Sequence, residues 1–169
     1  MNIKLIIGLG NPDPEYHRTY HNVGHQFIDV LVNKEQRTAL HQSKHGTGQA
    51  HGAKLLKTDA YMNESGLFVK QALKKYTVKP ENLLVVHDDS DITIGNMKLS
   101  FARNSGGHKG VQNIIHHLKT NAFWRLRIGI RPAREMRREK AEQLVLRTIT
   151  AADQKKITSV LQDALRAIE

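Results

Sequence analysis

The sequence predicts one layered α/β domain over residues 1–169, in which helices flank a mixed, largely parallel sheet. Three observations lead to this fold class. Short apolar runs that resemble buried strands alternate with segments of helical periodicity, as in chains built from β and α units in turn. The chain has 169 residues, which is enough for one domain with a substantial core. It contains no internal repeat, linker or low-complexity segment that would divide it.

The expected strands are short apolar runs. The first covers residues 3–9 and ends at a turn rich in glycine and proline, which allows an unusual backbone path. The pattern predicts further strands over residues 54–57, 83–87, 97–101 and 124–130. Residues 39–53 are polar and contain three glycines, and they predict a turn or a weak hairpin.

Helices are expected where apolar residues recur at helical spacing, over residues 23–32, 65–76 and 111–118. The charged run 131–140 is expected to form a solvated surface loop. A last helix follows Thr150, which can cap it, with Asp153 at the third position as in a variant of the capping box. Its expected buried stripe consists of Ile157, Val160, Leu161, Ala164, Leu165 and Ile168.

The net charge indicates a class of partner. Lysine and arginine number 26 against 16 acidic residues, which gives a formal charge of +10. This charge predicts a polyanionic partner, because phosphate contacts supply most of the non-specific affinity for nucleic acids. Solubility alone is the alternative explanation of the same charge.

Other features of the composition exclude whole classes of protein. The chain has no cysteine, so disulfides, thiol chemistry and cysteine metal sites are excluded. No apolar run approaches the roughly 20 residues that span a bilayer. The first residues lack the basic and apolar regions of a signal peptide. We therefore expect a cytoplasmic protein without a membrane partner.

Polar residues with catalytic potential come directly after the first strand. Asn11 lies in the glycine-rich turn, and His21 and Asn22 follow about ten residues later. Open α/β sheets tend to place their sites at the carboxyl ends of strands, and a histidine there can act as a base near neutral pH. Because the chain has ten histidines, His21 taken alone is more simply a surface or core side chain.

Four stretches of sequence occur in a recognisable order and spacing. They are residues 8–12 (GLGNP) with Tyr16 and residues 19–24 (TYHNVG); residues 61–66 (YMNESG); residues 87–91 (HDDSD); and residues 106–110 (GGHKG), followed by residues 125–130 (RLRIGI). Together they resemble the bacterial-type peptidyl-tRNA hydrolases, and the resemblance spans residues 3 to 132. It implies an enzyme that hydrolyses the ester joining a peptide to the 3′ ribose of tRNA, without a metal or organic cofactor.

The resemblance also implies roles for individual residues. His21 matches the catalytic base of the family, and Asp88 matches the carboxylate that holds its imidazole. The substrate-binding residues implied are Asn11, Tyr16, Tyr61, Asn63, His108 and Lys109. The neutral amides of Asn11 and Asn63 would orient the water and the substrate carbonyl without adding charge beside the nucleophile.

The same residues have structural explanations. Asn11 could tolerate a turn conformation, Asn63 could cap the helix near Ser65, and Asp88 could cap a turn after its strand. The three aspartates of residues 88–91 could instead form a divalent-cation cluster.

Three positions depart from the family pattern. Tyr20 replaces the arginine that usually precedes the histidine, and Thr58 replaces the proline in the strand before residues 61–63. Lys109 replaces the asparagine that usually follows His108. A charged lysine cannot accept a hydrogen bond, so we expect it either to contact phosphate or to perturb the site.

Binding of tRNA is expected to rely on backbone contacts, because enzymes of this family act on many tRNAs. The resemblance assigns Arg127 to the grip on phosphate, and Lys98, Arg103 and Lys109 could extend a basic track around the glycine turn. Weaker candidates are Arg125, Arg131 and Arg134. Arg125 and Arg127 should share one side of their strand, since alternate residues face the same way. We expect a monomer.

Three rival interpretations remain. The first is a non-enzymatic RNA-binding protein on the same scaffold, similar to intron-splicing relatives of this family. The second is a zinc enzyme, because His17, His21 and His25 recur at four-residue spacing, although Gly24 interrupts the run. The third is a dinucleotide site at the Gly-Leu-Gly turn, which lacks the third glycine of that fingerprint.

Overall fold

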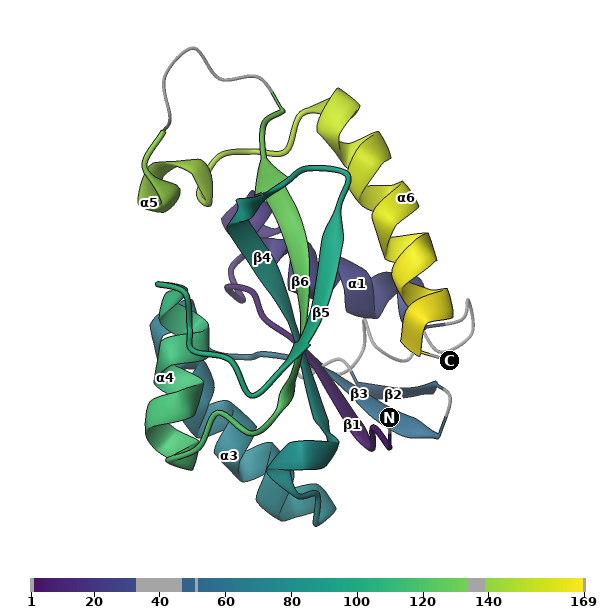
Figure 1. The fold of residues 1–169 in the computed structure, drawn as a ribbon, viewed down its shortest axis with the longest axis vertical. Coiled ribbons are helices and arrows are strands. Elements are labelled where there is room, and N and C mark those ends of the chain that lie inside the picture. The colour runs from purple at the N-terminus through teal and green to yellow at the C-terminus, as the bar shows by residue number, and fades with distance from the viewer. Residues whose placement is uncertain (1, 33–46, 51, 134–138, 169) are drawn as a thin grey trace.

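A six-stranded mixed sheet forms the centre of the molecule (Figure 1). The computed structural model describes residues 2–32, 47–50, 52–133 and 139–168. The strands are β1 (Leu5–Gly8), β2 (Thr47–Ala50), β3 (Ala53–Lys57), β4 (Leu83–Thr93), β5 (Met97–Phe101) and β6 (Trp124–Arg131), in the order β2-β3-β1-β4-β6-β5. The four inner strands are parallel, and the outer strands β2 and β5 are antiparallel to their neighbours. The predicted mixed, largely parallel sheet is confirmed.

Helices cover both faces of this sheet. The helices are α1 (Val23–Leu31), α3 (Ser65–Tyr76), α4 (Lys109–Leu118), α5 (Ala141–Leu144) and α6 (Ala151–Ile168). Short 3-10 turns lie at residues 14–16, 20–22, 62–64 and 80–82. Within the described part of the chain, no helix is long and apolar enough to cross a membrane.

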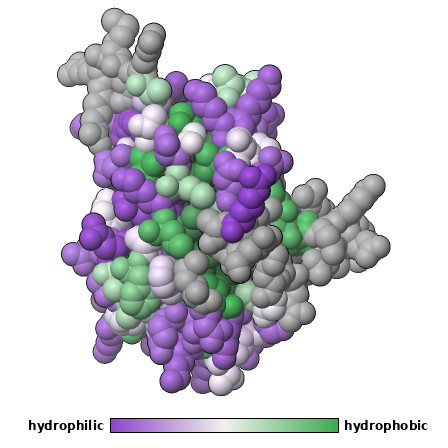
Figure 2. All heavy atoms as spheres, turned by 45° about the vertical axis from the view of Figure 1, so that its right-hand side comes forward, coloured by the Kyte–Doolittle hydropathy of each residue, from purple (hydrophilic) through white to green (hydrophobic). Residues whose placement is uncertain are grey.

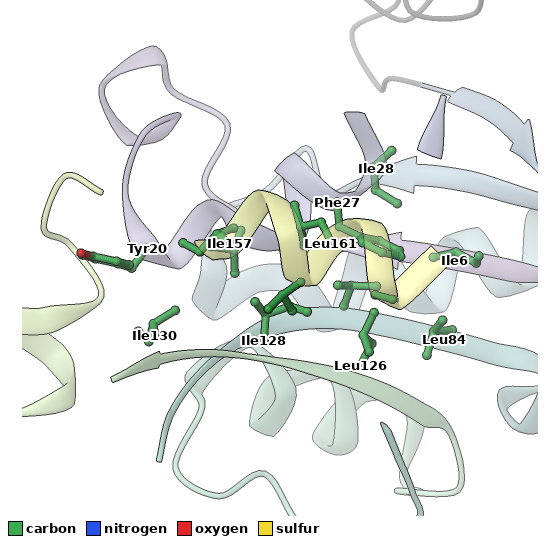
Figure 3. Packing of buried hydrophobic residues seen from close by; sticks show 14 of the residues in the cluster. Ile6, Tyr20, Phe27, Ile28, Leu84, Leu126, Ile128, Ile130, Ile157 and Leu161 are labelled. Atoms are coloured by element: carbon green, nitrogen blue, oxygen red, sulfur yellow. The ribbon is translucent and has the colours of Figure 1, made fainter. Parts of the chain in front are cut away.

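Two apolar clusters hold the helices on the sheet. On one face, Phe27 of α1 and Ile157 and Leu161 of α6 pack with Leu126 and Ile128 of β6 (Figure 3). On the other face, side chains of α3 and α4 pack against the alternate residues of β1 and β4. This alternation explains why the inner strands read as continuous apolar runs: both of their faces are buried.

Most predicted elements are confirmed, with shifted ends. The helix 65–76 and the strand 97–101 have the predicted bounds. The first strand begins at Leu5 rather than at residue 3. β4 continues to Thr93, well past the predicted end at residue 87, because the polar residues 87–89 still pair with β6 before a register shift. A sequence pattern cannot reveal this, because buried polar residues of a site resemble a loop.

Two segments lie partly outside the described residues. In the segment 39–53, residues 47–50 pair with residues 53–56 as antiparallel strands, in agreement with the predicted weak hairpin. Residues 39–46 and 51 of this segment lie outside the described part. In the charged run 131–140, residues 134–138 likewise lie outside it. The short helix α5 that follows was not predicted, and its Leu144 is buried in the core.

The cap of the last helix forms only half of a capping box. The Thr150 hydroxyl oxygen accepts the backbone N–H of Asp153 at 3.1 Å, as predicted. The Asp153 carboxylate instead accepts the hydroxyl of Tyr20 at 2.6 Å. The stripe residues Ile157, Val160, Leu161 and Ala164 are buried, while the side chains of Leu165 and Ile168 lie outside the description.

The carboxyl edge of the parallel strands is where loops and helix starts gather. The start of α1 approaches this edge closely: a Cβ on Gly24 would lie 2.4 Å from the Val86 carbonyl oxygen and 2.5 Å from that of Leu9. No side chain fits at that distance, so glycine permits the contact. The residues just before α1 are therefore brought beside the ends of β1 and β4.

Candidate active site

A pocket of about 480 Å³ lies at this carboxyl edge. All of the predicted catalytic and substrate-binding residues except Tyr16 line it: Asn11, His21, Tyr61, Asn63, Asp88, His108 and Lys109. Its remaining wall comes from the polar end of β4, the glycine turn before α4, and residues 141–146 around α5. Tyr16 is half-buried in the preceding 3-10 turn, where its carbonyl accepts the hydroxyl of Thr19.

Two histidines share one carboxylate oxygen at the floor of the pocket. Nδ1 of His21 lies 2.7 Å from Oδ1 of Asp88, and Nε2 of His108 lies 2.9 Å from the same oxygen. Asp88 is 1 % exposed and His21 is 8 % exposed. An ionised carboxylate can only accept, so each histidine donates an N–H to it.

These contacts assign the tautomers. His21 uses its Nδ1–H on Asp88, so in the neutral ring Nε2 carries the free lone pair. His108 caps α4, and its Nδ1 accepts the backbone N–H of Val111 at 3.3 Å, so its proton must be on Nε2. Of the two, His21 therefore has the nitrogen that can take a proton.

The electrostatic surroundings shift both partners. Burial lowers the pKa of His21, but the charge and hydrogen bond of Asp88 outweigh burial and raise it above 6.5, against a smaller lowering by the Lys109 cation. Burial raises the pKa of Asp88, yet His21 and His108 together hold it well below its usual range. The site therefore keeps an anion beside an imidazole of enhanced basicity.

Backbone contacts from a distant segment hold His21 in place. Its N–H donates to the Val145 carbonyl at 2.9 Å, and the N–H of Tyr20 donates to the Arg147 carbonyl at 3.2 Å. Val145 itself lines the pocket. The loop after α5 thus both supports the histidine and forms a wall of the cavity.

Asn11 is held from two sides. Its side-chain oxygen accepts the N–H of Met62 at 2.8 Å, so its NH₂ group is what it can offer to a ligand. Its backbone N–H and carbonyl are both bound by the side chain of Asn22, at 3.0 and 2.9 Å. Asn63 is exposed on the pocket rim, and the N-cap of α3 shows no side-chain capping bond.

The supporting role of Asn22 was not predicted from the sequence. An asparagine before a helix is typical of a helix cap, whereas the Asn22 side-chain amide binds the backbone N–H and carbonyl of Asn11, eleven residues away. The apolar wall formed by Ala141, Val145 and Leu146 was also missed. No signal in the charged run before it indicated a pocket wall.

The structure also tests the metal-site alternatives that the sequence left open. His17 lies 3.4 Å from the Pro12 carbonyl and His25 lies 3.0 Å from the Thr58 hydroxyl, so the predicted alternative at residues 17, 21 and 25 does not converge. In the predicted divalent-cation cluster of residues 88–91, the Asp89 carboxylate instead forms an ion pair with Arg127. Among the described residues, the set that could hold a metal is His21, Asp88 and His108, whose ligand atoms lie within 4.8 Å of one another.

The basic residues predicted to contact tRNA lie outside the pocket lining, except Lys109. Lys98 and Arg103 are exposed, and Arg127 pairs with Asp89 at 2.7 Å. Lys109 pairs with Glu142 of α5 at 3.1 Å across the pocket. The visible face in Figure 2 is mainly hydrophilic, with apolar residues in small separate groups.

The weaker basic candidates are mostly engaged within the protein. Arg125 is 2 % exposed and donates to the Asn104 carbonyl at 2.8 Å. Burial, and then the nearby charge of Arg127, lower its pKa, as expected if the two side chains share a face. Arg131 donates to the Ser90 carbonyl at 2.6 Å, and Arg134 lies outside the described residues.

A carboxylate-held imidazole beside neutral amides, at the carboxyl edge of an α/β sheet, is an arrangement typical of hydrolases. The family model described as peptidyl-tRNA hydrolase matches residues 5–169. A peptidyl-tRNA hydrolase of Aquifex aeolicus (strain VF5) is 38% identical over 99% of this chain and 89% of its own. One of Coxiella burnetii (strain CbuG_Q212) is 36% identical over 98% and 89%.

Solved structures agree with these relatives. The crystal structure of peptidyl-tRNA hydrolase from Acinetobacter baumannii has a TM-score of 0.81 and 34% identity, covering 98% of this chain and 86% of its own. The chain belongs to the peptidyl-tRNA hydrolase family. The family predicted from the four motifs is confirmed, and so is the enzymatic interpretation over the non-enzymatic alternative.

Proposed function

We propose that this chain releases peptide and free tRNA from peptidyl-tRNA by hydrolysis of their ester, with His21 as the base that activates water. One observation carries the proposal: the Nδ1 atom of His21 lies 2.7 Å from Oδ1 of a buried Asp88. This contact leaves Nε2 as the basic nitrogen on a residue that lines the pocket.

The reaction follows from this arrangement. Water loses a proton to Nε2 of His21 as its oxygen bonds to the ester carbonyl carbon, and the carbonyl oxygen becomes an oxyanion. Asp88 stabilises the imidazolium that forms. The intermediate then collapses, the bond to the ribose oxygen breaks, and the imidazolium returns its proton to that oxygen. The products are a peptide with a free carboxyl group and tRNA with a free 3′-terminal ribose.

Amide groups supply donors for the oxyanion. The NH₂ group of Asn11 is available because its oxygen is bound by Met62, and Asn63 lies on the same rim. Preorganised donors of this kind stabilise charge as it develops in the transition state. His108 lines the pocket and donates a hydrogen bond to the Asp88 carboxylate. We therefore assign His108 a supporting role, in which it orients Asp88 and lies beside the bound substrate.

Recognition of tRNA is assigned to the basic residues near the glycine turn. Lys98, Arg103, Lys109 and Arg127 contact backbone phosphates in this proposal, and the charge of +10 supplies the attraction. Arg127 forms an ion pair with Asp89, and Lys109 forms one with Glu142. At these two positions a tRNA phosphate therefore competes with a carboxylate for the basic side chain. A monomeric state and a cytoplasmic location remain predictions.

The mechanism uses no metal or organic cofactor, and this is testable. Hydrolysis of N-acetyl-aminoacyl-tRNA is measured after prolonged chelation and dialysis, with and without added Zn²⁺. Full activity after chelation is expected. Loss of activity that Zn²⁺ restores would assign His21, Asp88 and His108 to a metal instead, because they are the described set able to hold one.

A further inference from the structure

A buried threonine binds the turn that carries Asn11. Thr58 follows β3 and is 2 % exposed. Its N–H donates to the Gly8 carbonyl at 3.1 Å, and its hydroxyl oxygen lies 3.1 Å from the N atom and 2.9 Å from the carbonyl oxygen of Gly10. Nε2 of His25 lies 3.0 Å from the same hydroxyl. Thr58 occupies the position where proline is usual in the family pattern, and proline has neither the N–H nor the hydroxyl.

One set of proton positions gives a partner to each of these groups. The Gly10 N–H can only donate to the hydroxyl oxygen, and the hydroxyl proton goes to the Gly10 carbonyl at 2.9 Å. The oxygen then has one acceptor position left, so His25 donates its Nε2–H. Burial lowers the pKa of His25 to about 3, so the ring is neutral at working pH and acts as a hydrogen-bond donor.

The same turn is also enclosed by packing. A Cβ on Gly10 would lie 2.7 Å from the His25 ring, so the glycine backbone rests directly on the imidazole. Gly10 precedes Asn11, which Asn22 binds at its N–H and carbonyl. The turn is therefore held at Gly10 by Thr58 and His25 and at Asn11 by Asn22.

From this arrangement we propose that Thr58 and His25 are positioning residues, which hold the Gly10–Asn11 backbone so that the Asn11 amide meets the substrate carbonyl. The inference rests on the proposed function, in which Asn11 donates to that carbonyl. In this role His25 acts as a hydrogen-bond donor and does not change its protonation state. Thr58, which replaces the usual proline, supports the site through its hydroxyl. The loss of either polar group loosens Asn11 while the basic surface remains intact.

The test measures single-turnover hydrolysis of N-acetyl-aminoacyl-tRNA, tRNA affinity and Tm for a set of variants. Thr58→Val keeps the shape and removes the hydroxyl, and it should lower the rate about tenfold, the effect of one or two hydrogen bonds. Thr58→Ser keeps the hydroxyl and should retain the rate within about twofold. His25→Phe keeps a ring on Gly10 and should lower the rate in the same direction. Thr158→Val, on the exposed side of α6, is the matched control without effect.

A double-mutant cycle separates positioning from general stability. In an Asn11→Ala background, Thr58→Val should change the rate less than about twofold, because the group that it positions is already absent. Additive losses in the cycle, or equal rates for Thr58→Ser and Thr58→Val, would overturn the inference. If Asn11→Ala itself leaves the rate unchanged, the proposed role of Asn11 fails first. Should Thr58→Val fail to fold, the His25→Phe and Asn11→Ala cycle gives the same decision.

Discussion

The Nδ1 atom of His21 lies 2.7 Å from Oδ1 of Asp88, and these residues are 67 positions apart in the sequence. Burial of the carboxylate makes the contact strong, because few water molecules compete for it. His108 donates to the same oxygen, so the anion is oriented from two directions. The pair therefore determines both the tautomer and the basicity of the proposed base, and the first prediction concerns it.

Replacement of Asp88 by asparagine should lower the rate and move the acid limb of the pH profile to lower pH. The carboxylate raises the pKa of His21, so its neutralisation lets that pKa fall towards the value set by burial. A rate loss of at least about tenfold is expected, since the imidazole loses its anionic partner. The pH dependence of kcat/KM checks it, with Asp163→Asn on α6 as the control. An unshifted acid limb contradicts the prediction.

Replacement of Lys109 by asparagine tests the phosphate grip. The variant should bind tRNA more weakly, with a salt slope smaller by about one unit or slightly less, and should keep or improve kcat. The acid limb should move to higher pH, because the Lys109 cation lowers the pKa of His21. Titrations with deacylated tRNA at several salt concentrations, with Lys74→Asn as the control, measure the first effect. Unchanged affinity, slope and kcat would show a tolerated surface change.

Arg127 and Asp89 form the second pair at which phosphate competes with carboxylate. Arg127→Ala should weaken tRNA binding and reduce the salt slope by about one unit. Asp89→Asn should strengthen binding, because it removes a negative charge 2.7 Å from the guanidinium. Arg166→Ala on α6 is the matched control for the loss of one positive charge. Equal affinities for Arg127→Ala and the control would remove Arg127 from the tRNA surface.

His25 predicts the pH dependence of stability. Its pKa is about 3 in the folded protein and near 6.5 when unfolded, so between these values the unfolded chain binds more protons. The free energy of unfolding should therefore rise with pH across that window, by at most about 1.4 kcal/mol per pH unit from this residue. Above pH 6.5 His21 contributes a slope of the opposite sign, because its pKa is raised in the folded protein. The stability that the protonated His21 ring gains from Asp88 is lost as the ring deprotonates.

Urea unfolding at intervals from pH 4 to pH 8 measures this dependence. His25→Phe should give a shallower rise between pH 4 and pH 6.5, although not a flat one, because burial also lowers the pKa of His87. The exposed His116→Phe is the control. A variant with the same slope as the parent protein would contradict the burial argument for His25.

The candidate site could be predicted where its residues lie past the end of β1, at the carboxyl edge of the parallel strands. Asn11 comes after β1 and Asp88 lies in β4, and parallel strands bring such positions to one edge of the sheet. Spacing alone could not reveal that Asn22 binds Asn11, because an asparagine before a helix also fits a cap. The sequence also did not indicate the pocket wall at Val145 and Leu146, because the position of this wall depends on how the chain folds back after a charged run.

Hydrolysis by His21→Ala, measured with tRNA binding on the same samples, tests the central claim most directly. The variant should lose about 10²–10⁴ in single-turnover rate, the usual contribution of a positioned base. It should bind tRNA nearly as well as the parent, because affinity comes from the basic surface and not from the imidazole. His116→Ala should behave as the parent in both measurements. A His21→Ala protein that keeps more than about a tenth of the parent rate would contradict the account.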